Sequence, residues 1–229
     1  MSGYIGKVLS VDLTTGTWEA QAIEEKIYRN VLSGVGLGAY YLYKNIPGGA
    51  DPLGPDNILG FTSGLLTGTG SVMTGRWMAV CKSPLTGGWG DSNCGGDLAP
   101  AIKQCGHDAI FIRGASQKPV YIYVDNKGAE IRDAAPYWGM DAIEAEEALI
   151  RDTRKKKRPA VAVIGPGGEK LSLIAGISND LGRYAARSGV GAVMGSKKLK
   201  AVVLAGTKII KAADKEKSAY AVQDPLKIF

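Results

Sequence analysis

The sequence predicts an α+β fold built mainly from antiparallel β-sheets, with a few helices. Short apolar segments of strand length outnumber the segments with helical spacing. Several of these segments are separated by tight turns, which is typical of hairpins. The 229 residues include 32 glycines and are 45% hydrophobic, so the chain has enough apolar side chains for a sizeable core and many positions for turns.

The N-terminal part predicts a β-hairpin followed by two helices. Residues 4–13 and 17–23 alternate apolar and polar side chains, and a Thr-Thr-Gly turn separates them. Apolar residues then recur at helical spacing over residues 24–32, and Gly34 ends that helix. Residues 38–44 are expected to be the start of a second helix.

The middle of the chain is expected to be rich in strands. Residues 47–57 contain three prolines and three glycines, so they are expected to form a loop. The apolar segments after this loop have the length of strands: residues 58–62, 77–82, 108–113, 120–124 and 129–133. An Asp-Asn-Lys-Gly turn at residues 125–128 joins the last two.

The C-terminal part predicts one clear helix over residues 140–152, with acidic residues in its first half, where the helix dipole favours them. Short buried strands are expected at residues 160–164 and 201–205. Residues 171–177 are compatible with either a strand or a buried helix. The chain becomes charged and lysine-rich near its end, which predicts one domain over residues 1–207 and a charged linker or tail over residues 208–229.

Charge and hydropathy narrow the classes of function. The net charge is +6, and much of the excess lies in the basic residues 154–158, which are expected to form a solvated turn. No basic patch with interleaved aromatic residues is evident, which disfavours a nucleic-acid module. The chain contains no apolar stretch of membrane-spanning length and no signal-peptide pattern, so we expect a cytoplasmic protein that does not insert into membranes.

The cysteines and the single histidine do not form a metal motif. Cys81, Cys94 and Cys105 are too widely spaced for a C-x-x-C pair, and their odd number disfavours a complete disulfide framework. Cys94 lies in a glycine-rich segment, where it could be a reactive thiol, although an inert small residue is the favoured interpretation. His107 is expected to be packed or on the surface rather than a catalytic base.

Two glycine-rich segments, residues 83–96 and 183–197, carry the strongest functional signal. Both are predicted to be loops whose glycines allow close backbone approach, and arginines in the second suit an anionic group. Together they suggest a large, phosphate-bearing ligand. Asp91 and Asp97 flank the first segment, but their spacing assigns no acid/base pair.

Individual residues in and near these segments have alternative interpretations. Arg76 precedes a predicted strand and could form a surface ion pair or contact the ligand. Asn93 could cap a turn by bonding its own backbone. Arg183 and Arg187 are four residues apart, so on a helix they would share a face and could bind one anion, or they could be solvated charges.

These two segments, together with residues 34–40, 64–70 and 162–169, resemble the N-terminal domain of the tungsten-containing aldehyde ferredoxin oxidoreductases. The resemblance is ordered and nearly gapless from Gly3 to about Thr207. It implies a domain of two β-sheets with the cofactor lying against them. Members of that family are normally several hundred residues longer than this chain.

The resemblance implies a site for a molybdopterin-type cofactor formed by Arg76, Asn93, Gly95, Arg183, Tyr184, Ala186 and Arg187. Asn93 and the backbone carbonyl of Tyr184 would bind a magnesium ion that bridges the phosphates of two pterins, which suits the oxygen ligands that magnesium prefers. Tyr184 and Ala186 depart from the family, in which small residues and glycine are usual at these positions. The metal implied is tungsten, with molybdenum as the less favoured alternative. The dithiolene sulfurs of the cofactor would hold it.

The activity implied by the resemblance is oxidation of an aldehyde to a carboxylate, with electrons passing through a [4Fe-4S] cluster to ferredoxin. The cluster and the substrate pocket would belong to C-terminal domains or to a partner subunit, so this chain supplies no catalytic residue and would be inactive alone. Reductive chemistry on other substrates, and assembly with a second copy of the chain, are also compatible with the sequence.

Two alternatives remain at this point. The chain could be a free-standing pterin-binding scaffold or an inactive remnant, which the missing downstream motifs favour. A plain nucleotide-binding module is disfavoured because the phosphate-loop signature is absent around residues 188–191.

Overall fold

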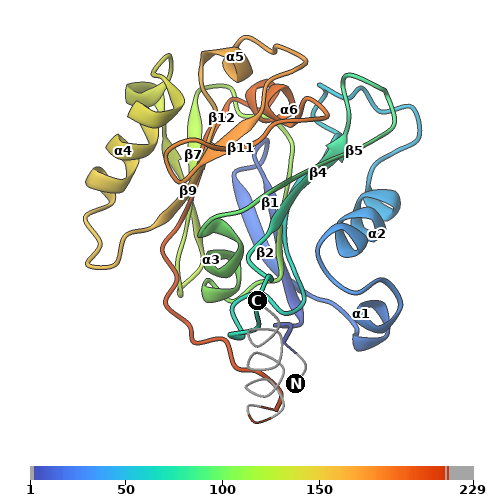
Figure 1. The fold of residues 1–229 in the computed structure, drawn as a ribbon. Coiled ribbons are helices and arrows are strands. Elements are labelled where there is room, and N and C mark those ends of the chain that lie inside the picture. The colour runs from blue at the N-terminus through green and yellow to red at the C-terminus, as the bar shows by residue number, and fades with distance from the viewer. Residues whose placement is uncertain (1–2, 215, 217–229) are drawn as a thin grey trace.

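Two six-stranded β-sheets face each other, with helices between them and on both outer faces (Figure 1). The computed structural model describes residues 3–214 and 216. The predicted linker or tail over residues 208–229 therefore lies largely outside the described residues. No helix in the described part of the chain has the length and apolar character needed to cross a bilayer.

The first sheet is formed entirely by residues 7–113, in the order β2-β1-β6-β3-β4-β5. The predicted N-terminal hairpin is confirmed, with β1 and β2 antiparallel and Asp12 opposite Thr17 next to the turn. β6 then enters parallel to β1, between β1 and β3. The strands are β1 (Lys7–Asp12), β2 (Thr17–Ala22), β3 (Leu59–Ser63), β4 (Trp77–Lys82), β5 (Trp89–Cys94) and β6 (Ala109–Arg113).

The second sheet is formed by residues 120–204, in the order β11-β10-β9-β12-β7-β8. β12 lies parallel to β7 and antiparallel to β9. The prediction of mainly antiparallel sheets is thus confirmed with a correction, since each sheet contains a parallel pair and both are mixed. The strands are β7 (Val120–Val124), β8 (Ala129–Asp133), β9 (Ala160–Val163), β10 (Ile177–Asn179), β11 (Arg183–Ala185) and β12 (Leu199–Leu204).

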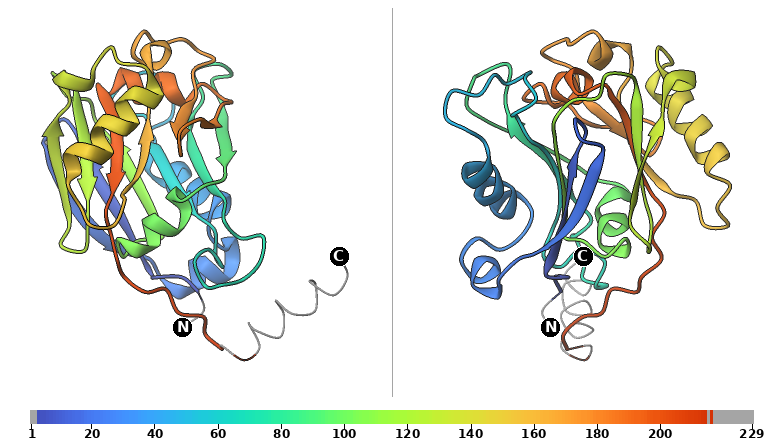
Figure 2. Two further views of the ribbon diagram at one scale, coloured as in Figure 1. Left: turned by 60° about the vertical axis from the view of Figure 1, so that its left-hand side comes forward. Right: turned by 180° about the vertical axis from the view of Figure 1, so that it is seen from behind.

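The helices cover the two sheets from outside and fill the space between them. In the view from behind, α1 and α2 lie on one side of the sheets and α4 on the other (Figure 2). α3 contacts strands of both sheets, as does α6. The helices are α1 (Glu25–Val31), α2 (Val35–Asn45), α3 (Leu98–Gln104), α4 (Ala142–Thr153), α5 (Pro166–Glu169) and α6 (Val190–Ser196), with a 3-10 turn η1 at Ala135–Tyr137.

Successive side chains of a strand point to opposite faces of its sheet, so the central strands of each sheet pack against other elements on both faces. In β6, Ile110 and Ile112 pack in the core between the sheets, whereas Phe111 packs under α2. In β12, Val202 belongs to the same central core and Val203 packs under α4. Strands buried on both faces consist of continuous apolar residues, which is why the sequence predicts them well.

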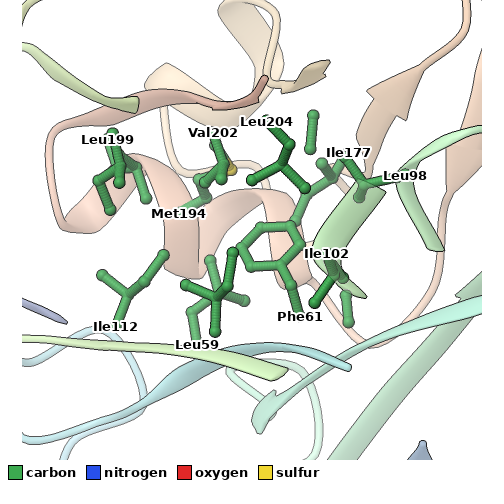
Figure 3. Packing of buried hydrophobic residues seen from close by; sticks show 14 of the residues in the cluster. Leu59, Phe61, Leu98, Ile102, Ile112, Ile177, Met194, Leu199, Val202 and Leu204 are labelled. Carbon is green, nitrogen blue, oxygen red and sulfur yellow. The ribbon is translucent and has the colours of Figure 1, made fainter. Parts of the chain in front are cut away.

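The central core brings the two sheets into direct contact. Leu59 and Ile112 of the first sheet point toward Leu199 and Val202 of the second, and Met194 of α6 lies among them (Figure 3). A core shared by both sheets makes them one folding unit rather than two separate halves.

Three lysines are fully buried, and their ammonium groups join distant segments. Lys103 donates to the carbonyls of Gly3 (2.6 Å) and Leu65 (2.7 Å). Lys197 donates to the carbonyls of Asn57 and Gly114. The third, Lys200, donates to the Met140 carbonyl and pairs with Glu169. Burial lowers the pKa of Lys103 and of Lys197 to about 8.

Three local predictions were wrong. Residues 83–96 are not all loop, because residues 89–94 form the edge strand β5. Residues 183–197 are not a loop either, since they contain β11 and the helix α6. Residues 171–176 form neither strand nor helix, and only Ile177 belongs to β10.

Candidate functional site

The two glycine-rich segments meet where β5 of the first sheet contacts β11 of the second, and this junction is called the seam. Both are edge strands, and both lie in the upper half of Figure 1. The Arg187 amide donates to the Ser92 hydroxyl (3.2 Å), and the Ser188 hydroxyl donates to the Asp91 carbonyl (2.9 Å). The structure thus joins residues that lie 95 and 97 positions apart in the chain.

Arg76 and Asn93 form one unit on this surface. Arg76 directly precedes β4, and Asn93 lies opposite Met78 on the paired strand β5. The Arg76 guanidinium donates to the Asn93 side-chain oxygen and, at 3.4 Å, to its backbone carbonyl. The contact replaces the predicted alternatives of a surface ion pair for Arg76 and a self-capped turn for Asn93.

Arg183, Tyr184, Ala186 and Arg187 are all exposed on the other side of the seam, while Ala185 between them is buried. Arg183 and Arg187 do not share a helical face, because residues 183–185 are extended. Arg183 instead reaches across to the first segment, where its Nη1 lies 3.6 Å from the point that a Cβ on Gly95 would occupy.

Three arginines on this surface form no salt bridge within the described part of the chain. Among the described residues, no carboxylate lies within salt-bridge distance of Arg76, Arg183 or Arg187. Both Arg76 and Arg183 are close enough to Cys94 to lower the pKa of its thiol in part. Exposed guanidinium groups beside open glycine backbone suit a phosphate or another planar anion.

Cys94 is not a reactive thiol in this setting. Its side chain is buried and its Sγ donates to Asn179 Oδ1 at 3.2 Å. Burial raises the pKa of Cys94 despite the nearby arginines, so the thiol stays protonated near neutral pH. Cys81 and Cys105 are also buried, and burial raises the pKa of each to about 12.

His107 and the flanking carboxylates provide no acid/base pair. His107 is buried, and burial together with Lys208 and Lys7 lowers its pKa to about 4, so it is neutral at physiological pH. Asp97 is exposed and Asp91 is half-buried at the seam. Within residues 3–214 and 216, no cluster of three or more His, Cys, Asp or Glu side chains could hold a metal ion.

Three residues that hold the site together are not predicted from the sequence. Asn179 is buried at the end of β10 and contacts the Gly95 carbonyl. Asp180 accepts a hydrogen bond from the Asp97 amide (2.7 Å). Glu146 of α4 is buried, and its Oε2 accepts from the Leu181 amide (3.1 Å). A Leu-Gly pair after Asp180 signals the turn, but nothing in the sequence signals these long-range contacts.

The Glu146 carboxylate supports a turn with strained backbone. Asp180 and Leu181 adopt φ values of +48° and +55°, which non-glycine residues seldom do. Glu146 lies 3.6 Å from Arg158, and burial raises its pKa. The turn leads directly into Arg183, so this buried carboxylate helps to set the course of β11.

Comparisons with known proteins agree with this architecture. The family model described as "Aldehyde ferredoxin oxidoreductase, N-terminal domain" matches residues 8–206. The tungsten-containing aldehyde ferredoxin oxidoreductases of Pyrococcus abyssi and Thermococcus kodakarensis are 42% and 43% identical to the chain over 226 residues. Both alignments cover 99% of this chain and 37% of the relative. The WOR-like subunit of an aliphatic sulfonate oxidoreductase from Pyrococcus furiosus is 39% identical, over 95% of the chain and 37% of the relative.

A solved structure extends the comparison to the fold. The active-site complex BamBC of benzoyl coenzyme A reductase, in complex with 1,5-dienoyl-CoA, contains a chain that superposes with a TM-score of 0.95 at 38% sequence identity. The match covers 99% of this chain and 34% of that one. The chain therefore spans just over a third of the length of these relatives. It belongs to the aldehyde ferredoxin oxidoreductase family and has the fold of that family's N-terminal domain.

Proposed function

We propose that this chain is the cofactor-binding N-terminal domain or subunit of a bis-pterin oxidoreductase. Tungsten is the favoured metal, and molybdenum is the alternative. The observation that carries the proposal is the seam between β5 and β11, where Arg76 bonds Asn93, Arg183 Nη1 lies beside Gly95, and the backbone of exposed Arg187 bonds Ser92. Residues 1–207 would form the domain, and residues 208–229 would link it to the remaining domains.

The donor set of the seam fits such a cofactor. The three arginines would bind the anionic phosphates of the pterins, and Gly95 leaves the backbone open for close approach. Asn93 and the backbone carbonyl of Tyr184 would hold the magnesium ion through oxygen atoms, the ligands that magnesium prefers. Tyr184, which is 47% exposed, and Ala186 would lie against the ring system. When bound, the tungsten centre supplies two-electron redox chemistry.

The chain's own residues would position the cofactor and exclude water, rather than transfer protons. His107 is neutral and buried, and the three thiols are protonated and buried, so none of these groups offers a base at the seam. A [4Fe-4S] cluster and the substrate pocket would belong to the remaining domains or to a partner chain. Protonated, unpaired thiols fit the reducing conditions of a cytoplasm.

The overall reaction we propose converts an aldehyde and water to a carboxylate and protons, in which water supplies the second oxygen and the two electrons pass through the iron–sulfur cluster to ferredoxin, the oxidant. The relatives from Pyrococcus abyssi and Thermococcus kodakarensis are among those named as aldehyde ferredoxin oxidoreductases, whereas one relative is named for aliphatic sulfonates and one solved structure for benzoyl coenzyme A. The aldehyde assignment follows the relatives with the higher identity. A scaffold that holds the cofactor without catalysis is the alternative that the experiment must separate.

The test is metal and pterin analysis of the natural protein purified from its own host, with any co-purifying chain. We expect tungsten or molybdenum with two pterins per metal, and reduction of a viologen dye when an aldehyde is added. An Arg183→Gln variant should lose most of the pterin, whereas Arg29→Gln, which removes an exposed i,i+4 ion pair on α1, should retain it. Pterin without aldehyde activity would favour the scaffold, and a protein free of metal and pterin would refute the proposal.

A further inference from the structure

Residues Asn179 and Asp180 hold the backbone of Gly95, Gly96 and Asp97 across the seam. The Asn179 Nδ2 donates to the Gly95 carbonyl at 3.1 Å. The Asp97 amide donates to Asp180 Oδ2 at 2.7 Å. Both segments flank the candidate cofactor residues, so their alignment determines which backbone groups face the ligand.

The Gly95 carbonyl is held from two directions. Besides Asn179, the indole Nε1 of Trp77 donates to it at 3.2 Å. Both side chains are almost fully buried, Trp77 at 0% and Asn179 at 1% exposure. The Cys94 thiol donates to Asn179 Oδ1, which leaves the Asn179 amide nitrogen facing the carbonyl. A carbonyl with two buried donors is strongly oriented toward the protein interior.

This orientation determines where the next amide points. In a planar trans peptide the carbonyl and the following N–H point in opposite directions. The Gly95 carbonyl points toward the buried Trp77 and Asn179, so the Gly96 N–H points away from them. Gly96 is partly exposed, and its N–H has no acceptor among the described residues.

The surroundings of residue 96 allow only glycine there. Gly96 has φ of +100°, and a Cβ added to it would lie 2.0 Å from Asp180 Oδ2 and 2.5 Å from Asn179 Nδ2. Gly95 has no such restriction, because its nearest neighbour for an added Cβ is Arg183 Nη1 at 3.6 Å. Gly96 thus lies in close contact with Asn179 and with the Asp180 carboxylate, and Arg183 lies beside the neighbouring Gly95.

We propose that the Gly96 N–H donates to an anionic phosphate oxygen of the bound ligand, and that Trp77 and Asn179 are the positioning residues that aim it. The inference rests on the proposed function for the identity of the ligand. Without the two inward donors the Gly95–Gly96 peptide could rotate, and its carbonyl oxygen would then face the anion and repel it. Arg183 would attract the anion through its positive charge, and the Gly96 N–H would fix the position of one phosphate oxygen through a directional hydrogen bond.

The test follows the Gly96 amide directly, by NMR of the full ¹⁵N-labelled chain titrated with inorganic pyrophosphate. We expect the Gly96 amide proton to move downfield and to saturate together with the Arg183 side-chain Nε–H. Asn179→Asp replaces the donor by an acceptor of the same size and adds a negative charge, whereas Trp77→Phe removes the indole N–H together with part of the ring and leaves the charge unchanged. Each variant should weaken pyrophosphate binding about tenfold, the loss expected for one hydrogen bond to a charged group.

The matched control is Ser178→Ala, on the same strand. Ser178 is fully buried and its hydroxyl has no partner among the described residues, so its loss should leave the affinity unchanged. Dispersed amide spectra establish that each variant is folded. If Asn179→Asp fails to fold, Trp77→Phe carries the comparison.

A Gly96 amide that does not respond to pyrophosphate overturns the inference, whatever happens at Arg183. Equal affinity in the control and in Trp77→Phe overturns the positioning role. Neither result depends on the metal and pterin content of the natural protein. The failure of this inference is therefore distinguishable from failure of the proposed function.

Discussion

Replacing Gly96 by alanine should destabilise the chain strongly, because two separate costs coincide there. The left-handed backbone, with φ of +100°, costs a non-glycine residue about 1–2 kcal/mol. The new Cβ would overlap Asp180 Oδ2 at 2.0 Å and force the carboxylate away from the Asp97 amide. Losing a hydrogen bond to a charged group adds about 1.5–3 kcal/mol. We therefore expect Gly96→Ala to lower the free energy of unfolding by about 4 kcal/mol and Tm by about 10 °C.

Two other glycines separate these costs. Gly139 has φ of +90° and open space where a Cβ would lie, so Gly139→Ala should show the backbone cost alone, about 1–2 kcal/mol. Gly95 has neither a left-handed φ nor an overlap, and Gly95→Ala should change stability by less than about 0.5 kcal/mol.

Urea unfolding followed by tryptophan fluorescence measures all three variants, because the fully buried Trp77 enters water on unfolding. The reasoning fails if Gly96→Ala costs no more than Gly139→Ala. Such a result would mean that Asp180 does not hold the Asp97 amide in solution.

Three further predictions concern charge and thiols. Arg183→Gln should weaken pyrophosphate binding about tenfold by calorimetry, while Arg29→Gln should not; equal affinities would remove Arg183 from the anion site. Burial raises the pKa of Cys81 to about 12 from an unfolded value of 9.0. Between these values the native state retains a proton that the unfolded state has lost, so this contribution to stability is present below pH 9 and is lost as the pH rises. Cys81→Ala should make the decline of unfolding free energy above pH 9 shallower by up to about 1.4 kcal/mol per pH unit, whereas Val80→Ala should shift the curve without changing its slope. The native chain should react only slowly with a thiol reagent such as DTNB and rapidly after denaturation, since all three cysteines are buried; fast labelling of native Cys94 would contradict its burial.

The strands that the sequence predicts well are those whose two faces are both apolar, such as β6 and β12. β5 was missed because its buried side consists of small residues. Gly90 and Ser92 face the seam, and a Cβ on Gly90 would lie 2.9 Å from Ser83 Cβ and 3.1 Å from Ser188 Cβ. Only small residues fit there because another segment of the chain packs closely against β5. Small residues show no alternation of apolar and polar side chains, so the strand has no hydrophobic pattern in the sequence.

The parallel pairings could not be predicted either, because they join residues far apart in the chain. β1 pairs with β6, and β7 with β12, and no local turn marks such a choice. The candidate site residues came from a family resemblance. Asn179 and Asp180 support these residues through contacts with residues about 85 positions away in the chain. Such long-range contacts cannot be recognised from a single sequence.

The division of the sheets along the chain has a consequence for synthesis. The first sheet needs nothing beyond residue 113, so all its strands are available for pairing while the second is still being translated. The second sheet acquires its central strand, β12, last, and until residues 199–204 emerge the edges of β7 and β9 that will flank it remain unpaired. A nascent chain that pauses within α6 would thus expose two open edges and half of the central core, the kind of intermediate that chaperones recognise and that aggregates most readily.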